Sequence, residues 1–130
     1  MTQYLVSIHL PDDFDPEQQD VSVPGDISAL NEEMIARGIR VFVGGLQPPT
    51  RARTIRAASN GGTLVTDGPF VEAKEHVGGF WVLECADLEE AVEWGKKATI
   101  ACRAPVEVRE FRAPPPERLK ARREAEARGK

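Results

Sequence analysis

Cysteine, histidine and long apolar runs are scarce in this 130-residue sequence, and each scarcity excludes a class of protein. The two cysteines, Cys85 and Cys102, are too few and too far apart for a disulfide framework or a zinc site, so we expect no bound metal. No apolar run approaches membrane-spanning length. The opening residues, MTQYLVSIHLPDD, lack the basic region of a signal peptide. We therefore expect a cytoplasmic protein that does not associate with membranes.

Nucleotide-binding signatures are absent as well. The glycine pairs Gly44-Gly45 and Gly78-Gly79 have neither P-loop nor Rossmann spacing around them. Paired glycines in strands usually mark a bulge or a close approach of two backbones. We therefore expect no cofactor, and we interpret these glycines as thinning the sheet beside a pocket.

Basic residues are scarce in residues 1–111, which hold 10 lysines and arginines against 18 aspartates and glutamates. Residues 112–130 reverse this balance, with 7 basic residues against 3 acidic ones. Because binding to nucleic-acid phosphates requires a basic face, the acidic body argues against direct nucleic-acid binding. We predict one domain over residues 1–111, followed by a charged tail over 112–130 that is extended or loosely helical.

Apolar periodicity and turn residues predict the order β-α-β-(hairpin)-β-α-β. The first helix is expected to begin at an Asp26 N-cap and to stop at Gly38. The second is expected to begin at a capping box formed by Asp87 and Glu90. This order predicts an α+β protein, a ferredoxin-like βαββαβ unit with an inserted hairpin and an antiparallel sheet. The strands are expected at residues 3–10, 40–46, 51–58, 63–66, 79–85 and 106–111.

One face of such a sheet is covered by helices and the other face is bare. Phe42, Phe80, Val82 and Trp81 occupy both faces of their strands, so the bare face is expected to be apolar too. Large exposed apolar patches mark partner surfaces. We therefore predict a homodimer in which the sheet face of one subunit packs against that of the other.

The stretch TDGPFVEAKEHVGGF, residues 66–80, places about a dozen mostly polar residues between two predicted strands. A hairpin needs only about two to five. Long ordered loops inside compact domains are usually functional, and the proline, phenylalanine and glycines of this stretch argue against disorder. We therefore predict that it is a loop facing a ligand.

The chain resembles the YCII-related family, and in particular the branch named for its DGPF motif. The resemblance lies in GGLQPP at 44–49, LVTDGPFVEAKEHVGGFWVLE at 64–84, DLEEAVEW at 87–94 and VEVREF at 106–111. Val71 stands where the branch usually has alanine, and Ala73 where it usually has threonine. The residues that match the branch pattern are Asp67, Gly68, Pro69, Phe70, Glu72, Lys74, Glu75, Gly79 and Phe80.

The resemblance implies a dimeric α/β barrel built from ferredoxin-like subunits. It also implies an enzymatic activity that depends on a histidine and an aspartate near a cleft. The reaction itself is not established for the family. Some relatives lie beside, or are fused to, extracytoplasmic-function sigma factors. This implies a regulatory role in association with a transcription component.

Asp67 and His9 are the candidate catalytic residues. Asp67 precedes a glycine, so its side chain either closes an Asx-turn or acts as a proton carrier in a half-buried cleft beside Phe70. His9 lies near the end of the first strand, where it is either held by a backbone hydrogen bond or meets Asp67 as an acid/base pair. His76 lies outside the motif positions and is interpreted as a solvated loop residue.

Phe70, Glu72, Lys74 and Glu75 are the candidate ligand-binding residues. The three charged residues form either an ion network that pins the loop or a site in which Lys74 binds an anionic group. The sequence thus predicts a small homodimer that binds a small polar or anionic molecule and transforms it by acid/base chemistry. The alternative is a non-catalytic ligand sensor, or an accessory protein that modulates a transcription component.

Overall fold

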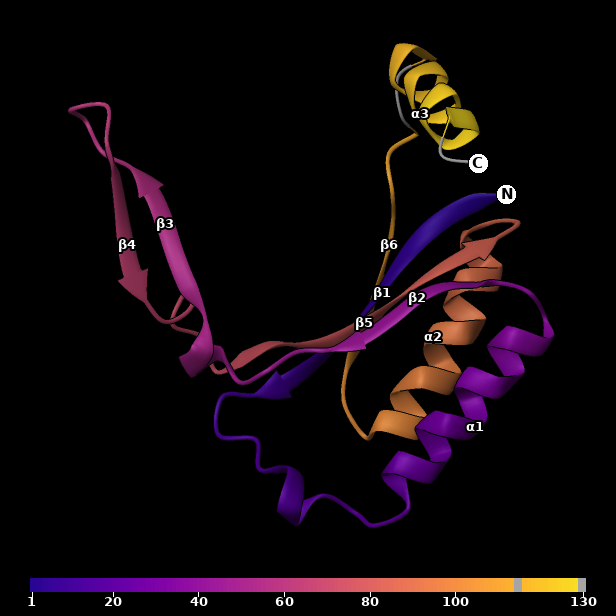
Figure 1. Cartoon of the computed structure of the whole chain (residues 1–130). Helices are drawn as coiled ribbons and strands as arrows, with labels where there is room; N and C mark the ends of the chain where they lie inside the picture. The colour runs from indigo at the N-terminus through magenta and orange to yellow at the C-terminus, as the bar shows by residue number, and fades with distance from the viewer. Residues whose placement is uncertain (114–115, 129–130) are drawn as a thin grey trace.

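The computed structural model describes residues 1–113 and 116–128 and places four strands in one antiparallel sheet. Helices α1 (Val23–Ala36) and α2 (Leu88–Cys102) both lie on one face of this sheet (Figure 1). The predicted α+β class with an antiparallel sheet is therefore confirmed. The strands are β1 (Thr2–Pro11), β2 (Arg40–Gly45), β5 (Glu75–Cys85) and β6 (Val106–Glu110), in the spatial order β2-β5-β1-β6.

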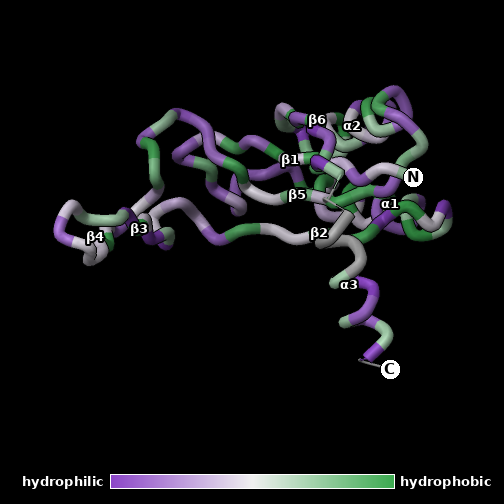
Figure 2. The backbone as a smooth tube through the Cα atoms, turned by 90° about the horizontal axis from the view of Figure 1, so that it is seen from above, coloured by the Kyte–Doolittle hydropathy of each residue, from purple (hydrophilic) through white to green (hydrophobic). Residues whose placement is uncertain are grey.

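The predicted hairpin forms a separate two-stranded antiparallel ribbon of β3 (Arg53–Ala57) and β4 (Thr63–Asp67). The ribbon projects from one end of the four-stranded sheet and stands clear of it in both views (Figures 1 and 2). Its turn is closed by a 2.8 Å hydrogen bond from the Ala58 N–H to the Gly62 carbonyl oxygen. Gly61 lies in this turn with φ +87°, a conformation that favours glycine.

β5 begins at Glu75, four residues before the Gly79 start that the sequence predicts. The predicted dozen-residue loop is therefore wrong in extent, because only residues 68–74 connect β4 to β5. The neighbouring strand causes the difference. β1 and the residue after it continue the ladder, and the Asp12 N–H donates a 2.6 Å hydrogen bond to the Lys74 carbonyl oxygen. Backbone pairing with β1 thus extends β5 into residues 75–78, which the sequence predicts to be part of a polar loop.

α1 begins at Val23, with Ser22 as its N-cap, so the predicted Asp26 cap is wrong. Pro24 suits the first turn of a helix, and the fully buried Val23 fixes this turn against the core. Asp26 instead accepts a 2.9 Å hydrogen bond from Nη2 of Arg103, the residue that follows α2. The start of α1 is thereby tied to the end of α2.

The other predicted helix ends agree with the structure. Gly38 follows α1 with φ +69°. At the start of α2, Oδ1 of Asp87 accepts a 2.9 Å hydrogen bond from the Glu90 N–H. In return, Oε2 of Glu90 accepts a 3.0 Å hydrogen bond from the N–H of Ala86, one residue before the N-cap. The predicted capping residues are confirmed, with the return bond displaced by one position.

The core lies between the sheet and the two helices. Trp81 is buried at its centre, and its Nε1 donates a 2.9 Å hydrogen bond to Oδ1 of Asn31 on α1. Cys85 is fully buried here, as predicted, and Cys102 is buried too. The largest fully buried side chains are Trp81, Tyr4, Met34, Leu83, Val6, Val23 and Cys85.

The opposite face of the sheet is left bare by α1 and α2 (Figure 1). Phe42 on β2 is 52% exposed there, and its ring centroid lies 5.8 Å from that of Phe80 on β5. Leu5 and Val82 are cross-strand partners on the same face. The bare face is therefore apolar along its centre.

The tail contains a helix, α3 (Pro116–Arg128), whose residues 121–128 are exposed. Within it, Nε of Arg122 lies 3.4 Å from Oε1 of Glu126. Two short 3₁₀ turns, Pro16–Gln18 and Pro49–Arg51, complete the elements. In the part of the chain that the structure describes, every helix is too short or too polar to cross a membrane.

Candidate functional site

A bulge in β5 decides which side chains reach the end of the sheet. Ile8 of β1 pairs with Gly79, but the next residue of β1 pairs with Val77, which leaves Gly78 without a partner. One extra residue reverses the alternation of side chains along a strand. His76 therefore faces the helix-covered side of the sheet rather than the bare side.

Glycine at the bulge also makes room for a neighbouring side chain. A Cβ on Gly78 would lie 2.2 Å from Cδ1 of Leu10, the cross-strand partner of His76. Leu10 uses this space to pack against the hydrophobic core. The adjacent Gly79 allows a close backbone approach, because its Cβ would lie 2.9 Å from the carbonyl oxygen of Gly44. The bulge and close approach predicted from the paired glycines are both present.

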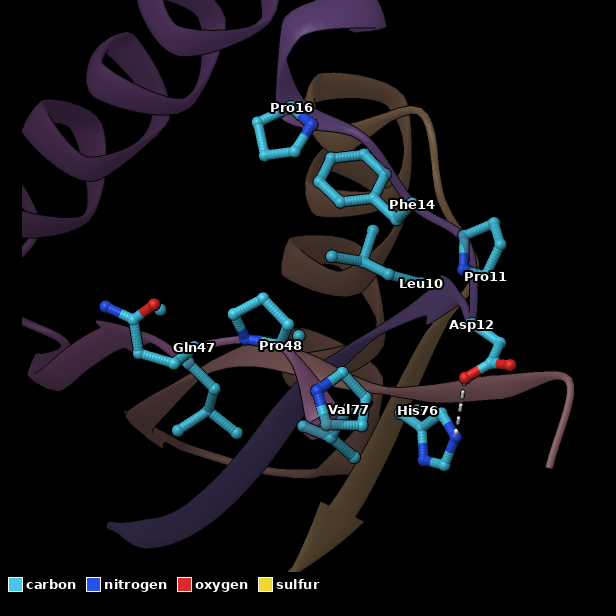
Figure 3. Close-up of a pocket in the computed structure, with 13 residues that line it drawn as sticks. Leu10, Pro11, Asp12, Phe14, Pro16, Gln47, Pro48, His76 and Val77 are labelled. Atoms are coloured by element: carbon cyan, nitrogen blue, oxygen red, sulfur yellow. Dashed lines mark ion pairs between the residues drawn. The ribbon is translucent and has the colours of Figure 1, made fainter. Parts of the chain in front are cut away.

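An imidazole and a carboxylate meet at this end of the sheet. Asp12 lies two residues beyond Leu10, so it is the diagonal neighbour of His76 across the β1–β5 pair. Nε2 of His76 lies 3.5 Å from Oδ1 of Asp12 (Figure 3). The side chain of His76 is only 16% exposed, whereas that of Asp12 is 67% exposed. Nδ1 is the ring nitrogen that lies away from this contact.

Three hollows meet at His76. The first, of about 510 Å³, lies between the end of β1, the start of β5 and the residues that follow β2. The second, of about 1030 Å³, reaches the loop of residues 68–74, and the third, of about 350 Å³, reaches the base of the ribbon. Among the residues that the structure describes, His76 is the only one with an ionisable side chain that lines all three.

The walls of the first hollow are mainly apolar. Its polar side chains are Asp12, Gln47 and His76. Figure 3 shows the ring of Phe14 above Leu10, with Pro48 and Val77 between Gln47 and His76. The remaining lining residues are Leu10, Pro11, Phe14, Pro16, Gly45, Leu46, Pro48, Pro49, Val77 and Gly78.

Three of the predicted ligand-binding residues lie at the second hollow. Glu72, Lys74 and Glu75 line it together with Asp12 and His76. All three are exposed. The structure thus brings these charged residues to the mouth of the site, beside the histidine that the sequence prediction left out.

The DGPF residues Asp67 and Phe70 lie at the ribbon and its exit. Asp67 ends β4 with an 87% exposed side chain, and its Oδ1 lies 3.1 Å from Nε of Arg53 on β3. Phe70 is exposed, and the guanidinium carbon of Arg56 lies 4.9 Å from the centre of its ring. Both side chains therefore contact arginines of the ribbon, and neither lines the hollows around His76.

His9 lies on β1 just beyond the bulge. Its Nε2 is 3.2 Å from Oγ of Ser7, and its backbone N–H donates a 2.9 Å hydrogen bond to the carbonyl oxygen of Pro105. Within residues 1–113 and 116–128, the polar contacts of His9 and Asp67 include none that joins the two. Their assignment as an acid/base pair rests on the sequence alone.

The sequence does not predict His76 and Asp12 as site residues. The interpretation of His76 as a solvated loop residue is wrong, because it lies on β5 with its side chain largely buried. The signal that could have located it is the pair Gly78-Gly79. Paired glycines predict a bulge, and a bulge changes the face that the preceding residues present.

The arrangement suits proton transfer. A nearly buried imidazole can accept a proton from a bound molecule, and an adjacent carboxylate stabilises the imidazolium that forms. Asp12, at 3.5 Å from Nε2, is the carboxylate beside this imidazole. Among the described residues, no group of three or more histidine, cysteine, aspartate or glutamate side chains is arranged to hold a metal ion.

A family model and one relative match this chain. The family model for the YCII-related domain matches residues 6–112, which include both helices of the body and every strand except the first four residues of β1. The chain is also 38% identical over 80 residues to a protein of Rhizobium meliloti (strain 1021) named "Uncharacterized protein R00369". That alignment spans 62% of this chain and 64% of the relative's length. By the extent of the domain match, the chain belongs to the YCII-related family.

Proposed function

We propose that this protein binds a small molecule in the first hollow and exchanges a proton with it through His76. The observation that carries the proposal is the contact of Nε2 of His76 with Oδ1 of Asp12, at 3.5 Å, where three hollows meet. Histidine is the most frequent general acid or base in enzymes. A volume of about 510 Å³ lies within the usual range for small-molecule sites.

In the proposed step, the ligand lies against Nδ1 of His76 and gives its proton to that atom. The carboxylate of Asp12 then balances the charge of the imidazolium from the Nε2 side of the ring. Gln47 supplies a neutral hydrogen-bonding group elsewhere in the hollow. Asp67 and His9 have no part in this path.

The DGPF segment has a different role in this proposal. The residues Asp67, Gly68, Pro69 and Phe70 support placing the chain in the DGPF branch. They lie at the end of β4 and directly after it. The segment positions the loop 68–74, whose charged residues Glu72, Lys74 and Glu75 flank the entrance. These residues would select ligands by charge before the ligand reaches His76.

Loss of the imidazole tests the proposal. Ligand-observed NMR with a fragment library would identify compounds that bind the wild-type chain. We expect His76→Asn to lose most of these hits, and His9→Asn, the matched histidine control, to keep them. Equal sets of hits for wild type and His76→Asn would contradict the assignment of the site.

The sensor alternative uses the same hollow without proton transfer. The exposed basic side chains Arg122, Arg123 and Arg128 of α3 favour it, since they offer a surface to an acidic partner such as a transcription component. NMR spectra of the hit compounds, recorded over hours with enzyme present, separate the two functions. Chemical conversion or exchange of a ligand proton for deuterium supports catalysis, and unchanged compounds support the sensor.

We further infer a ferredoxin-like subunit that forms a homodimer through the bare sheet face, as in a dimeric α/β barrel. The strand order β2-β5-β1-β6 with two helices on one face supports the subunit, and the exposed Phe42 beside Phe80 supports the interface. Sedimentation velocity tests it. We expect Phe42→Glu to convert a dimer to a monomer, and Ile100→Glu, an exposed apolar position on α2, to leave the dimer intact.

A further inference from the structure

We infer that the ligand of the first hollow is a mainly apolar molecule that carries one hydroxyl group, such as a phenol or an enol. The inference rests on the proposed function of this hollow and names the class of its ligand. It departs from the polar or anionic ligand that the sequence predicts. Three features of the hollow support it.

The first feature is the charge of its walls. Among the residues within 1–113 and 116–128 that line the first hollow, none is a lysine or an arginine, and the one charged side chain beside His76 is the carboxylate of Asp12. An anionic group placed there would lose its hydration without gaining an opposite charge, and Asp12 would repel it. Lys74 lines only the second hollow and Arg51 only the third.

The second feature is an inner hollow that continues the first one toward the core. It has a volume of about 220 Å³ and shares Leu10, Phe14, Gly45 and Gly78 with the first hollow. Among the described residues that line it, none is charged, Gln19 carries the one amide side chain, and the indole N–H of Trp81 is already bonded to Asn31. Its other lining residues are Ile8, Ile27, Val43, Gly44, Gly79, Phe80, Trp81 and Cys102. Leu10 and Phe14 line both hollows, and these mainly apolar surroundings suit an apolar ring or chain.

The third feature is the separation of the polar groups. Figure 3 shows Asp12 and His76 together at one side of the hollow and Gln47 at the other, with Pro48 and Val77 between them. A ligand whose body lies along the apolar wall therefore meets one strong polar partner, the imidazole. A hydroxyl group satisfies that partner by donating to Nδ1 of His76. When its proton moves to Nδ1, the O–H bond breaks, the N–H bond forms, and the ligand oxygen keeps the electron pair beside the imidazolium.

Three probes of stated chemistry test the inference by isothermal titration calorimetry at neutral pH. They are 4-butylphenol, 4-butylbenzoate and glycerol 3-phosphate. We expect 4-butylphenol to bind about tenfold or more tightly than either anion. His76→Phe, which keeps a ring but has neither ring nitrogen, should weaken binding of the phenol by about tenfold, because the hydrogen bond to Nδ1 is lost.

A charge placed at the rim supplies a second test that does not depend on removing the histidine. Leu46 lines the first hollow and is 54% exposed, so Leu46→Lys should fold normally. We expect this variant to bind 4-butylbenzoate more tightly than the wild type does. The ratio of its affinity for 4-butylphenol to its affinity for 4-butylbenzoate should therefore fall. Val71→Lys is the matched control, because Val71 is 57% exposed and lies outside the lining of the hollow.

The outcomes separate the inference from the proposed function. Tighter binding of either anion, weakened by Lys74→Gln and unaffected by Leu46→Lys, would overturn the inference while leaving a ligand site beside His76. Failure of all three probes, together with a fragment screen without hits, would count against the proposed function itself.

Discussion

Leu10 occupies the space into which a side chain on Gly78 would point. A Cβ on Gly78 would lie 2.2 Å from Cδ1 and 2.7 Å from Cγ of Leu10, closer than two carbon atoms can approach. The bulge that turns His76 toward the first hollow therefore requires glycine at this position for its packing against Leu10.

Substitution of Gly78 should damage the site more than the fold. We expect Gly78→Ala to force Leu10 into another rotamer that fills the first hollow, with a loss of about 1–3 kcal/mol in unfolding free energy and loss of ligand binding. Gly25→Ala is the control, because a Cβ there meets nothing within 4 Å and Gly25 lies outside the lining of the hollows. Urea unfolding and the phenol titration would check both variants. Unchanged binding by Gly78→Ala would show that Leu10 does not control the volume of the hollow.

Loss of the acceptor for the buried indole should destabilise the protein without changing the site. Oδ1 of Asn31 accepts from Nε1 of Trp81 at 2.9 Å and from Nη1 of Arg40 at 3.2 Å. Asn31→Ala leaves the indole N–H unsatisfied, which costs about 1–3 kcal/mol. Asn31→Asp, which keeps an oxygen at that position, should lose less. If thermal unfolding showed equal losses of stability in Asn31→Ala and Asn31→Asp, the hydrogen bond between Asn31 and Trp81 would contribute nothing beyond packing.

Both thiols should be inert at neutral pH. Burial, with smaller effects of Glu90 and Asp87, raises the pKa of Cys85 from 9.0 to about 11, and burial raises that of Cys102 to about 11 as well. We expect the native protein to resist a disulfide exchange reagent at pH 8 and to react fully once unfolded. Rapid labelling of the native protein would contradict the burial of both side chains.

The same shifts predict a loss of stability in alkali. Because the folded-state pKa values lie above the unfolded ones, neutral thiols contribute stability that is fully present below about pH 9. That contribution is lost as pH rises toward about 11, at about 2 kcal/mol for each thiol. Urea unfolding at pH 8 and pH 10.5 would measure it. Cys102→Ala should show a smaller decline over this range than the wild type.

Removal of the motif aspartate should have little effect. The Asp67–Arg53 pair is exposed on both sides, and such pairs contribute about 0–1 kcal/mol. We expect Asp67→Asn to unfold within a degree or two of the wild type and to bind 4-butylphenol equally well. Arg53→Gln should behave in the same way. A large loss of binding in Asp67→Asn would return Asp67 to the catalytic role that the sequence analysis gives it.

Local signals in the sequence predicted most of the fold. Gly38 after α1, the Asp87 and Glu90 capping residues, and the turn around Gly61 each depend on neighbours within a few residues, and each agrees with the structure. The predictions are wrong where contacts between segments that are distant in the sequence determine the structure. β5 extends back to Glu75 because β1 pairs with it, and α1 starts at Val23 because that side chain is buried in the core.

The site was harder to predict for the same reason. Lys74 was selected as a charged residue in a recognisable motif, and it does lie at the mouth of the second hollow. His76 and Asp12 are distant in the sequence, and they meet only because of the register between β1 and β5 beyond the bulge at Gly78. A strand pattern read one segment at a time contains no information about that register.

β5 is hydrogen-bonded to β1 on one side and to β2 on the other. His76 itself is fixed in the ladder opposite Leu10 of β1, whereas Phe14, Pro16 and residues 47–49, which also line the first hollow, belong to the segments that follow β1 and β2. During divergence of the family, new chemical preferences would arise most readily by exchange of these two connecting segments. The imidazole of His76 would keep its position while the ligand preference of the surrounding residues changed.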